Sequence, residues 1–113
     1  MIKSEIKQKI LARTVSLEKI GIRDLAWNQE DIKNLINSIM FDDIGILGGN
    51  VYKIEDENII PLSDNWSCDP KANEKREEYY LRSKIVSKKY IEKYPVKDNE
   101  IILFSLVFTD EIG

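Results

Sequence analysis

The stretch that most constrains the fold of this chain is IILFSLVF at residues 101–108, where Ser105 is the only polar side chain. Alternate side chains of a strand point to opposite faces of its sheet, so both faces of this segment are apolar. Strands of this kind lie inside a sheet, with both faces covered or nearly so. The segment is also much shorter than the roughly 20 apolar residues of a membrane-spanning helix. We therefore predict a central strand here.

A β-hairpin is predicted upstream of this strand. Residues 51–54 alternate in the manner of a strand, EDEN at 55–58 makes a polar turn, and IIPL at 59–62 forms the second arm. Because Pro61 cannot donate a hydrogen bond to a ladder, this arm belongs at the edge of a sheet or ends its pairing. Just before the hairpin, ILGGN at 46–50 predicts a tight backbone bend, since the Lys or Ser of a phosphate-binding loop does not follow.

Three segments predict helices. Residues 2–22 carry apolar side chains near helical spacing, as one bent helix or as a helix and a turn, with Gly21 as a stop. Residues 29–40 follow Asn28, a residue type that caps helix N-termini well, and place their apolar side chains on one stripe. Residues 71–93 predict the third and longest helix.

The order of these elements predicts the fold class. Helices stand before and between the strands, and the small Ser83 and Ser87 would let the third helix lie close to a sheet. We therefore predict an α+β fold, in which a small antiparallel sheet of the hairpin and the hydrophobic central strand packs with about three helices. No linker or repeat divides the sequence, so residues 1–113 are predicted to form a single domain.

The formal net charge of −3 hides an acidic middle segment. Residues 24–70 carry ten acidic and two basic side chains, whereas residues 1–23 are basic and residues 71–113 are close to neutral. Acidic surfaces repel nucleic acid and attract cationic partners. The lysines of the third helix alternate with glutamates, which indicates a solvated surface and not a nucleic-acid interface. These lysines are Lys84, Lys88, Lys89 and Lys93.

Cys68 is the only cysteine of the chain, and it lies in DNWSCD at residues 64–69. The chain contains no histidine, which excludes Cys-His and Ser-His-Asp catalysis, and a lone cysteine with scattered carboxylates does not match a zinc site. We interpret the stretch as a turn in which Trp66 and Cys68 anchor one side of an extended segment in the core. A single cysteine and the lack of an export signal at the start predict a cytoplasmic location.

Four motifs follow one another along the chain: ILGGNVY at 46–52, DNWSCD at 64–69, a tyrosine-rich helix ending in YIEKYP, and IILFSLVF at 101–108. Together they resemble the immunity protein 40 family of bacterial polymorphic toxin systems. The resemblance covers about residues 20–108, so the N-terminal helix within residues 1–20 lies outside it. The turn EDEN lacks the glycine that the family pattern leads us to expect.

The resemblance implies a binding protein and not an enzyme. Such proteins are made beside a secreted toxin and protect the producing cell by binding the catalytic C-terminal domain of that toxin. Many such toxins act on nucleic acids, as nucleases do, so their clefts are basic and would attract an acidic inhibitor. We expect no cofactor, no metal ion, and no nucleic-acid or membrane partner. The predicted partner-binding residues, including two aromatic anchors, are Asp42, Asp43, Tyr52, Glu55, Asp56, Glu57, Asp64 and Trp66.

Two other functional classes stay open at this point. One is a small cytoplasmic adaptor or interaction protein whose partner is not a toxin. The other is an enzyme that uses paired carboxylates, which would need a cleft holding two carboxyl groups with raised pKa values. For the acidic loops themselves, ordinary solvation of a protein surface is an alternative account.

Overall fold

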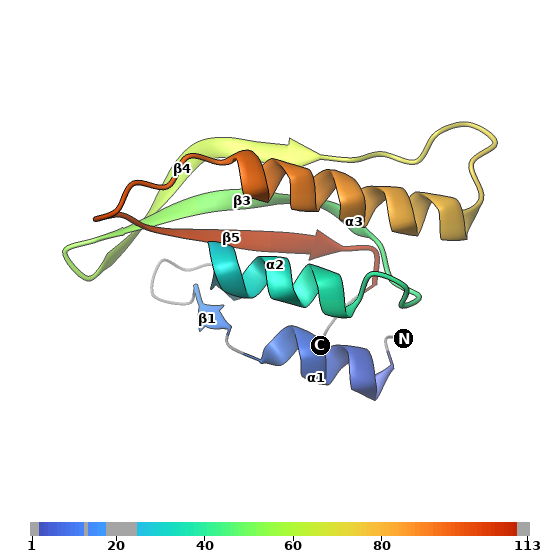
Figure 1. Ribbon diagram of the computed structural model, residues 1–113, viewed down its shortest axis with the longest axis horizontal. Helices are drawn as coiled ribbons and strands as arrows, with labels where there is room; N and C mark the ends of the chain where they lie inside the picture. Colours follow the sequence, from blue (N-terminus) through green and yellow to red (C-terminus); the bar gives the residue numbers. More distant parts are fainter. Residues whose placement is uncertain (1–2, 13, 18–24, 111–113) are drawn as a thin grey trace.

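Five strands form one antiparallel sheet in this computed structural model, which describes residues 3–12, 14–17 and 25–110 (Figure 1). Three helices accompany the sheet in the described part of the chain, which confirms the predicted α+β class. The strands follow the order β1-β2-β5-β3-β4 across the sheet. Their bounds are Val15–Ser16 for β1, Leu25–Asn28 for β2, Ile46–Glu55 for β3, Asn58–Ser67 for β4 and Ile101–Phe108 for β5.

Strand β5 lies between β2 and β3, so the prediction of a central strand is confirmed. One set of its alternate side chains, including Ile102, Phe104 and Leu106, joins the main core. On the other face Leu103 belongs to a smaller buried cluster, whereas Ile101 is half exposed. The second face of the strand is therefore only partly covered.

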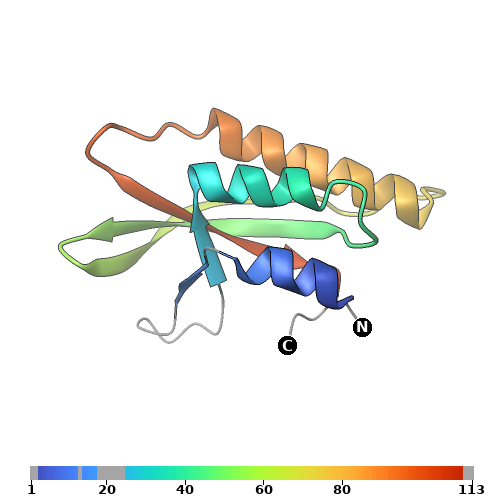
Figure 2. The ribbon, with the colours of Figure 1, turned by 60° about the horizontal axis from the view of Figure 1, so that its bottom comes forward.

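The helices pack against one face of the sheet (Figure 2). Their bounds are Ser4–Leu11 for α1, Gln29–Ser38 for α2 and Arg76–Lys93 for α3. Helices α2 and α3 lie side by side over β3 and β5, and all three helices contribute to one apolar core. In α3 the small Ser83 and Ser87 are fully buried, as their size predicts for a helix that lies close to a sheet.

The predicted hairpin is present, with arms longer than expected. β3 and β4 pair from Gly48 with Ser67 to Glu55 with Asn58, and β4 is an edge strand, as Pro61 predicts. The two turn residues, Asp56 and Glu57, both have positive φ angles, of 50° and 68°. Positive φ at both central residues is typical of type I′ hairpin turns, which usually carry glycine there.

The expected bend at ILGGN is wrong, because both glycines lie inside β3. Glycine lets neighbouring atoms approach the β3 backbone closely. A Cβ atom on Gly49 would lie 2.2 Å from the Ser105 carbonyl oxygen and 2.3 Å from Cη2 of Trp66. The expected turn at DNWSCD is also wrong, since residues 64–67 belong to β4. Trp66 and Cys68 are nevertheless both buried, as their spacing of two predicts for an extended segment.

Helix boundaries differ from the predicted ones in a few places. α2 begins after Asn28, whose side chain accepts a hydrogen bond from the Asp31 backbone N–H at 2.8 Å, so the predicted cap is confirmed. α3 begins at Arg76 and not at 71, because Lys71 and Glu74 close a separate turn before it. The predicted stop at Gly21 lies outside the described residues. The two short strands β1 and β2 were not predicted.

Candidate partner-binding site

The predicted acidic residues form two clusters at opposite ends of β3. Asp42 and Asp43 lie in the loop between α2 and β3, whereas Glu55, Asp56 and Glu57 form the end of β3 and the hairpin turn (Figure 1). A ten-residue strand is about 30 Å long, which is close to the width of one whole protein–protein interface. The two clusters therefore cannot both lie at the centre of a single contact. We call them the loop cluster and the turn cluster.

The turn cluster is acidic, and one lysine neutralises part of its negative charge. Lys53 Nζ lies 3.8 Å from a carboxylate oxygen of Glu55 and 3.4 Å from one of Glu100. The backbone N–H of Lys97 and the Lys53 ammonium hold the pKa of Glu100 below its usual value. Asp56 and Glu57 are exposed, and neither forms an ion pair with another residue that the structure describes.

The two predicted aromatic anchors are buried in the free protein. Trp66 is 8% exposed, stacks on Tyr90 with ring centroids 4.7 Å apart, and donates from Nε1 to Ser87 Oγ at 2.9 Å. Tyr52 is 4% exposed and belongs to the smaller cluster on the far face of the sheet. Both side chains stabilise the sheet and offer a partner very little surface.

Asp64 is tied to the end of α3. Its carboxylate accepts a hydrogen bond from the Tyr94 hydroxyl at 2.6 Å. Burial of the phenol, with that carboxylate beside it, raises the pKa of Tyr94 to about 12. This hydrogen bond holds β4 against the helix. Asp64 therefore has a structural role that does not depend on a binding partner.

Cys68 occupies a structural corner between β4 and α3. The Arg82 guanidinium donates from Nη1 to Cys68 Sγ at 3.1 Å and makes a two-pronged ion pair with Glu74, with both N···O distances at 2.7 Å. The Tyr79 hydroxyl donates to the Cys68 carbonyl at 2.6 Å. The Arg82 hydrogen bonds lower the pKa of Glu74 to about 2. These contacts fix the segment that leads into α3, and the thiol itself is buried.

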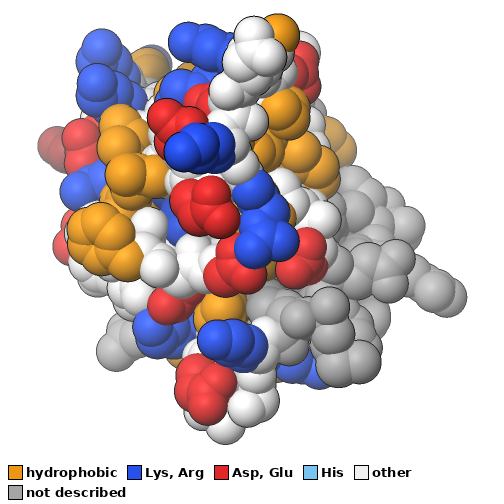
Figure 3. All heavy atoms as spheres, turned by 90° about the vertical axis from the view of Figure 1, so that its right-hand side faces the viewer, with side chains coloured by type: hydrophobic (Ala, Val, Ile, Leu, Met, Phe, Trp, Pro, Cys, Tyr) orange, Lys and Arg blue, Asp and Glu red, His pale blue; other side chains and the backbone are white. Residues whose placement is uncertain are grey.

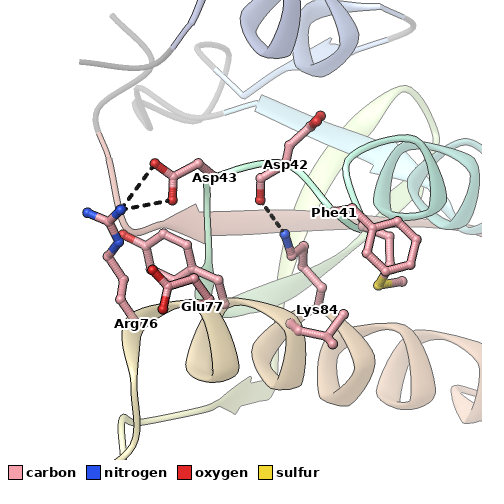
Figure 4. Close-up of a pocket in the computed structure, with 9 residues that line it drawn as sticks. Phe41, Asp42, Asp43, Arg76, Glu77 and Lys84 are labelled. Atoms are coloured by element: carbon pink, nitrogen blue, oxygen red, sulfur yellow. Dashed lines mark hydrogen bonds and ion pairs between the residues drawn. The ribbon is translucent and has the colours of Figure 1, made fainter.

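The loop cluster lies beside a cleft between the α2–β3 loop and the start of α3 (Figure 4). The cleft has a volume of about 480 Å³. Figure 3 shows this end of the molecule, where hydrophobic side chains are interspersed with charges of both signs. The residues lining the cleft are Met40, Phe41, Asp42, Asp43, Arg76, Glu77, Tyr80, Leu81 and Lys84.

Lys84 is the least expected residue of this cleft. It is only 1% exposed, so the prediction that it belongs to a solvated helix surface is wrong. Its Nζ donates to the carbonyl oxygens of Ile39 at 3.0 Å and Asp42 at 2.8 Å, which ties the end of α2 and the following loop to α3. Burial lowers the pKa of Lys84 to about 8, with Asp42 and Asp43 opposing the shift.

Sequence reasoning also missed Phe41, whose side chain is 91% exposed. One signal could have found it. In helical phase Phe41 stands opposite Ile32 and the buried stripe of α2, and two aspartates follow it directly. A large apolar residue off the buried stripe and beside charges is a candidate contact residue.

No metal chemistry is evident at either end. Among the residues that the structure describes, no three or more Cys, Asp or Glu side chains gather where they could hold a metal ion. In the same part of the chain, none of the helices combines the length and the apolar character needed to cross a membrane. What both clusters offer is charge, and the loop cluster adds an exposed aromatic ring.

Comparison with known proteins gives one match. Residues 16–108, most of the chain, match the model of a protein family described as Immunity protein 40. Families of immunity proteins are generally non-enzymatic. No curated protein and no solved structure matches the chain.

Proposed function

This chain belongs to the immunity protein 40 family, and from that premise we propose that it binds and neutralises the catalytic domain of a cognate bacterial toxin. The family match is the observation that carries the proposal. The toxin is made beside this protein in the same cell, and binding in the cytoplasm protects the producer. The protein acts by occupying the toxin and not by catalysis.

Surface charge supports this proposal. A toxin that acts on nucleic acid needs a basic cleft, and the excess of acidic over basic side chains in this chain lies in its middle segment. Complementary charge steers encounter and raises the association rate more than it raises the final affinity. The loop and turn clusters are therefore the two candidate faces for first contact with the toxin.

Rescue of growth tests the proposed function. The C-terminal domain of the toxin encoded immediately upstream is expressed in a sensitive bacterium, with and without this chain. We expect the domain alone to stop growth and co-expression to restore it. Killing that persists beside folded, soluble protein would overturn the proposed pairing.

Charge reversal tests which end meets the toxin. The turn cluster is changed to lysine at Glu55, Asp56 and Glu57, and association rates are measured at several salt concentrations. If this end takes part, we expect slower association and a weaker dependence on salt, because long-range attraction is lost. Unchanged association rates would show that the hairpin turn is not part of the contact. Asp43→Lys makes the same comparison at the other end of β3.

A further inference from the structure

The Phe41 ring is exposed although the backbone on both sides of it is fixed. The Asp42 N–H donates to the Ile39 carbonyl at 3.0 Å, and the Ile44 N–H donates to the Asp42 carbonyl at 2.8 Å. Ile39 and Ile44 are themselves fully buried. The ring thus projects from a loop whose ends are anchored in the core, so its exposure is a consequence of the loop geometry.

Two lysines from other elements hold this loop in place, and one arginine lies beside it. Lys84 of α3 donates to two of its carbonyls, as described above. Lys9 of α1 donates to Asp42 Oδ2 at 3.0 Å and to the Ser38 carbonyl at 2.9 Å. Arg76 of α3 lies 3.5 Å from the Asp43 carboxylate (Figure 4). A side chain presented on a preorganised loop loses little conformational freedom when it binds, and preorganisation raises affinity.

The surroundings of Phe41 have the composition of an interface centre. Leu81 lines the same cleft, and Ile85 stands one helical turn further along α3; both are partly exposed apolar side chains. Around them the rim carries Asp43 and Arg76, whose side chains are both more than half exposed. An apolar centre with a charged rim, containing a large aromatic residue, is typical of binding hot spots.

We propose that Phe41 is the anchor residue of the toxin-binding surface and inserts into an apolar pocket of the toxin domain that carries basic side chains at its edge. This inference rests on the proposed function and names the part of the surface that carries the affinity. The basic edge is the proposed counterpart of Asp43: its exposed pair with Arg76 is weak, so Asp43 can exchange that partner for a toxin cation. The turn cluster then contributes attraction at a distance and not the central contact.

Binding of purified proteins tests the inference. Affinity for the purified C-terminal domain of the upstream toxin is measured by calorimetry for the intact chain, for Phe41→Ala and for Ile101→Ala. Ile101 is a matched control, because it is an apolar side chain that is 51% exposed on the opposite face of the sheet. Since Phe41 is almost fully exposed, its replacement should leave the melting temperature unchanged. We expect Phe41→Ala to weaken binding by about 30-fold or more, as hot-spot truncations do, and Ile101→Ala to change it little.

Each other outcome has a distinct meaning. If the intact chain binds and Phe41→Ala binds equally well, the anchor assignment is overturned while the proposed function stands. If the intact chain does not bind the toxin domain, the proposed function fails and the assignment with it. If Phe41→Ala converts a dimer into a monomer without loss of toxin affinity, the occupant of this surface is a second copy of the chain, which also overturns the assignment.

Discussion

Gly49→Ala should destabilise this protein strongly, because the new methyl group meets two obstacles that cannot easily move. It would lie 2.2 Å from the Ser105 carbonyl oxygen, which belongs to the central strand, and 2.3 Å from Cη2 of Trp66. The indole is held on both sides by its stack on Tyr90 and its hydrogen bond to Ser87. It can retreat only by giving up these contacts.

The expected cost follows from these contacts. Overpacking a well-filled core costs about 1–3 kcal/mol. Loss of the Trp66–Ser87 hydrogen bond adds about 1 kcal/mol, and weakening of the aromatic stack adds a similar amount. The total of about 3–5 kcal/mol corresponds to a fall in melting temperature on the order of 20 °C for a domain of this size.

Denaturant unfolding measures this cost, with Gly45→Ala as the control. A Cβ on Gly45 would lie 2.6 Å from the Tyr80 ring and 2.9 Å from a Thr109 methyl group. These are side-chain atoms that can shift, so we expect a cost below about 2 kcal/mol. If Gly49→Ala costs no more than this control, the reasoning about a rigid obstacle is refuted.

A double-mutant cycle separates the two obstacles. Trp66→Leu removes the indole but leaves the Ser105 carbonyl in place. Gly49→Ala should therefore cost about 1–2 kcal/mol less in the Trp66→Leu background than in the native one, although it should still cost something. An equal cost in both backgrounds would show that Trp66 is not the obstacle.

Two further predictions concern the turn and the buried lysine. Glu57→Gly should stabilise the protein by about 0.5–1 kcal/mol in denaturant unfolding. Glycine removes the steric cost of φ at 68°, and its greater conformational entropy in the unfolded chain offsets part of that gain. A destabilised variant would contradict the I′ turn. The pKa of Lys84 falls from 10.5 to about 8 on folding, so the unfolded state holds more protons between these values and stability should rise with pH there. Unfolding measured from pH 7 to 10.5 should show this rise for the native chain relative to Lys84→Met, reaching roughly 3 kcal/mol, and parallel curves would contradict it.

The parts of the fold that the sequence predicts are those in which one periodic pattern decides the outcome. The apolar run at 101–108 has a single reading as a central strand, and Asn28 marks the start of α2 through one local hydrogen bond. The glycine pair was misread because its meaning depends on Trp66, which is 17 residues away in sequence and directly opposite in the sheet. β2 escaped prediction because its four residues are too few to show a period.

The candidate site depends even more than the fold on contacts between residues that are far apart in the sequence. Acidic residues can be counted in a sequence, but the separation of the loop and turn clusters depends on the ten-residue strand β3 that lies between them. Lys84 reads as a surface residue by type, and only the packing of α2 against α3 buries it. The predicted helix ends at residue 40, so the position of Phe41 opposite the buried stripe is a signal that the prediction leaves unused.

The central place of β5 has a consequence for synthesis of the protein. β2 and β3 both pair with this strand, yet it is the last described strand to leave the ribosome. A nascent chain that ends before residue 101 exposes two unsatisfied strand edges and an apolar helix face, which are the features that chaperones recognise and that lead to aggregation. The sheet can therefore close only after residues 101–108 have left the ribosome. Under the proposed function, a chain can protect the cell only once β5 has been made and paired, so a premature stop before residue 101 should abolish protection.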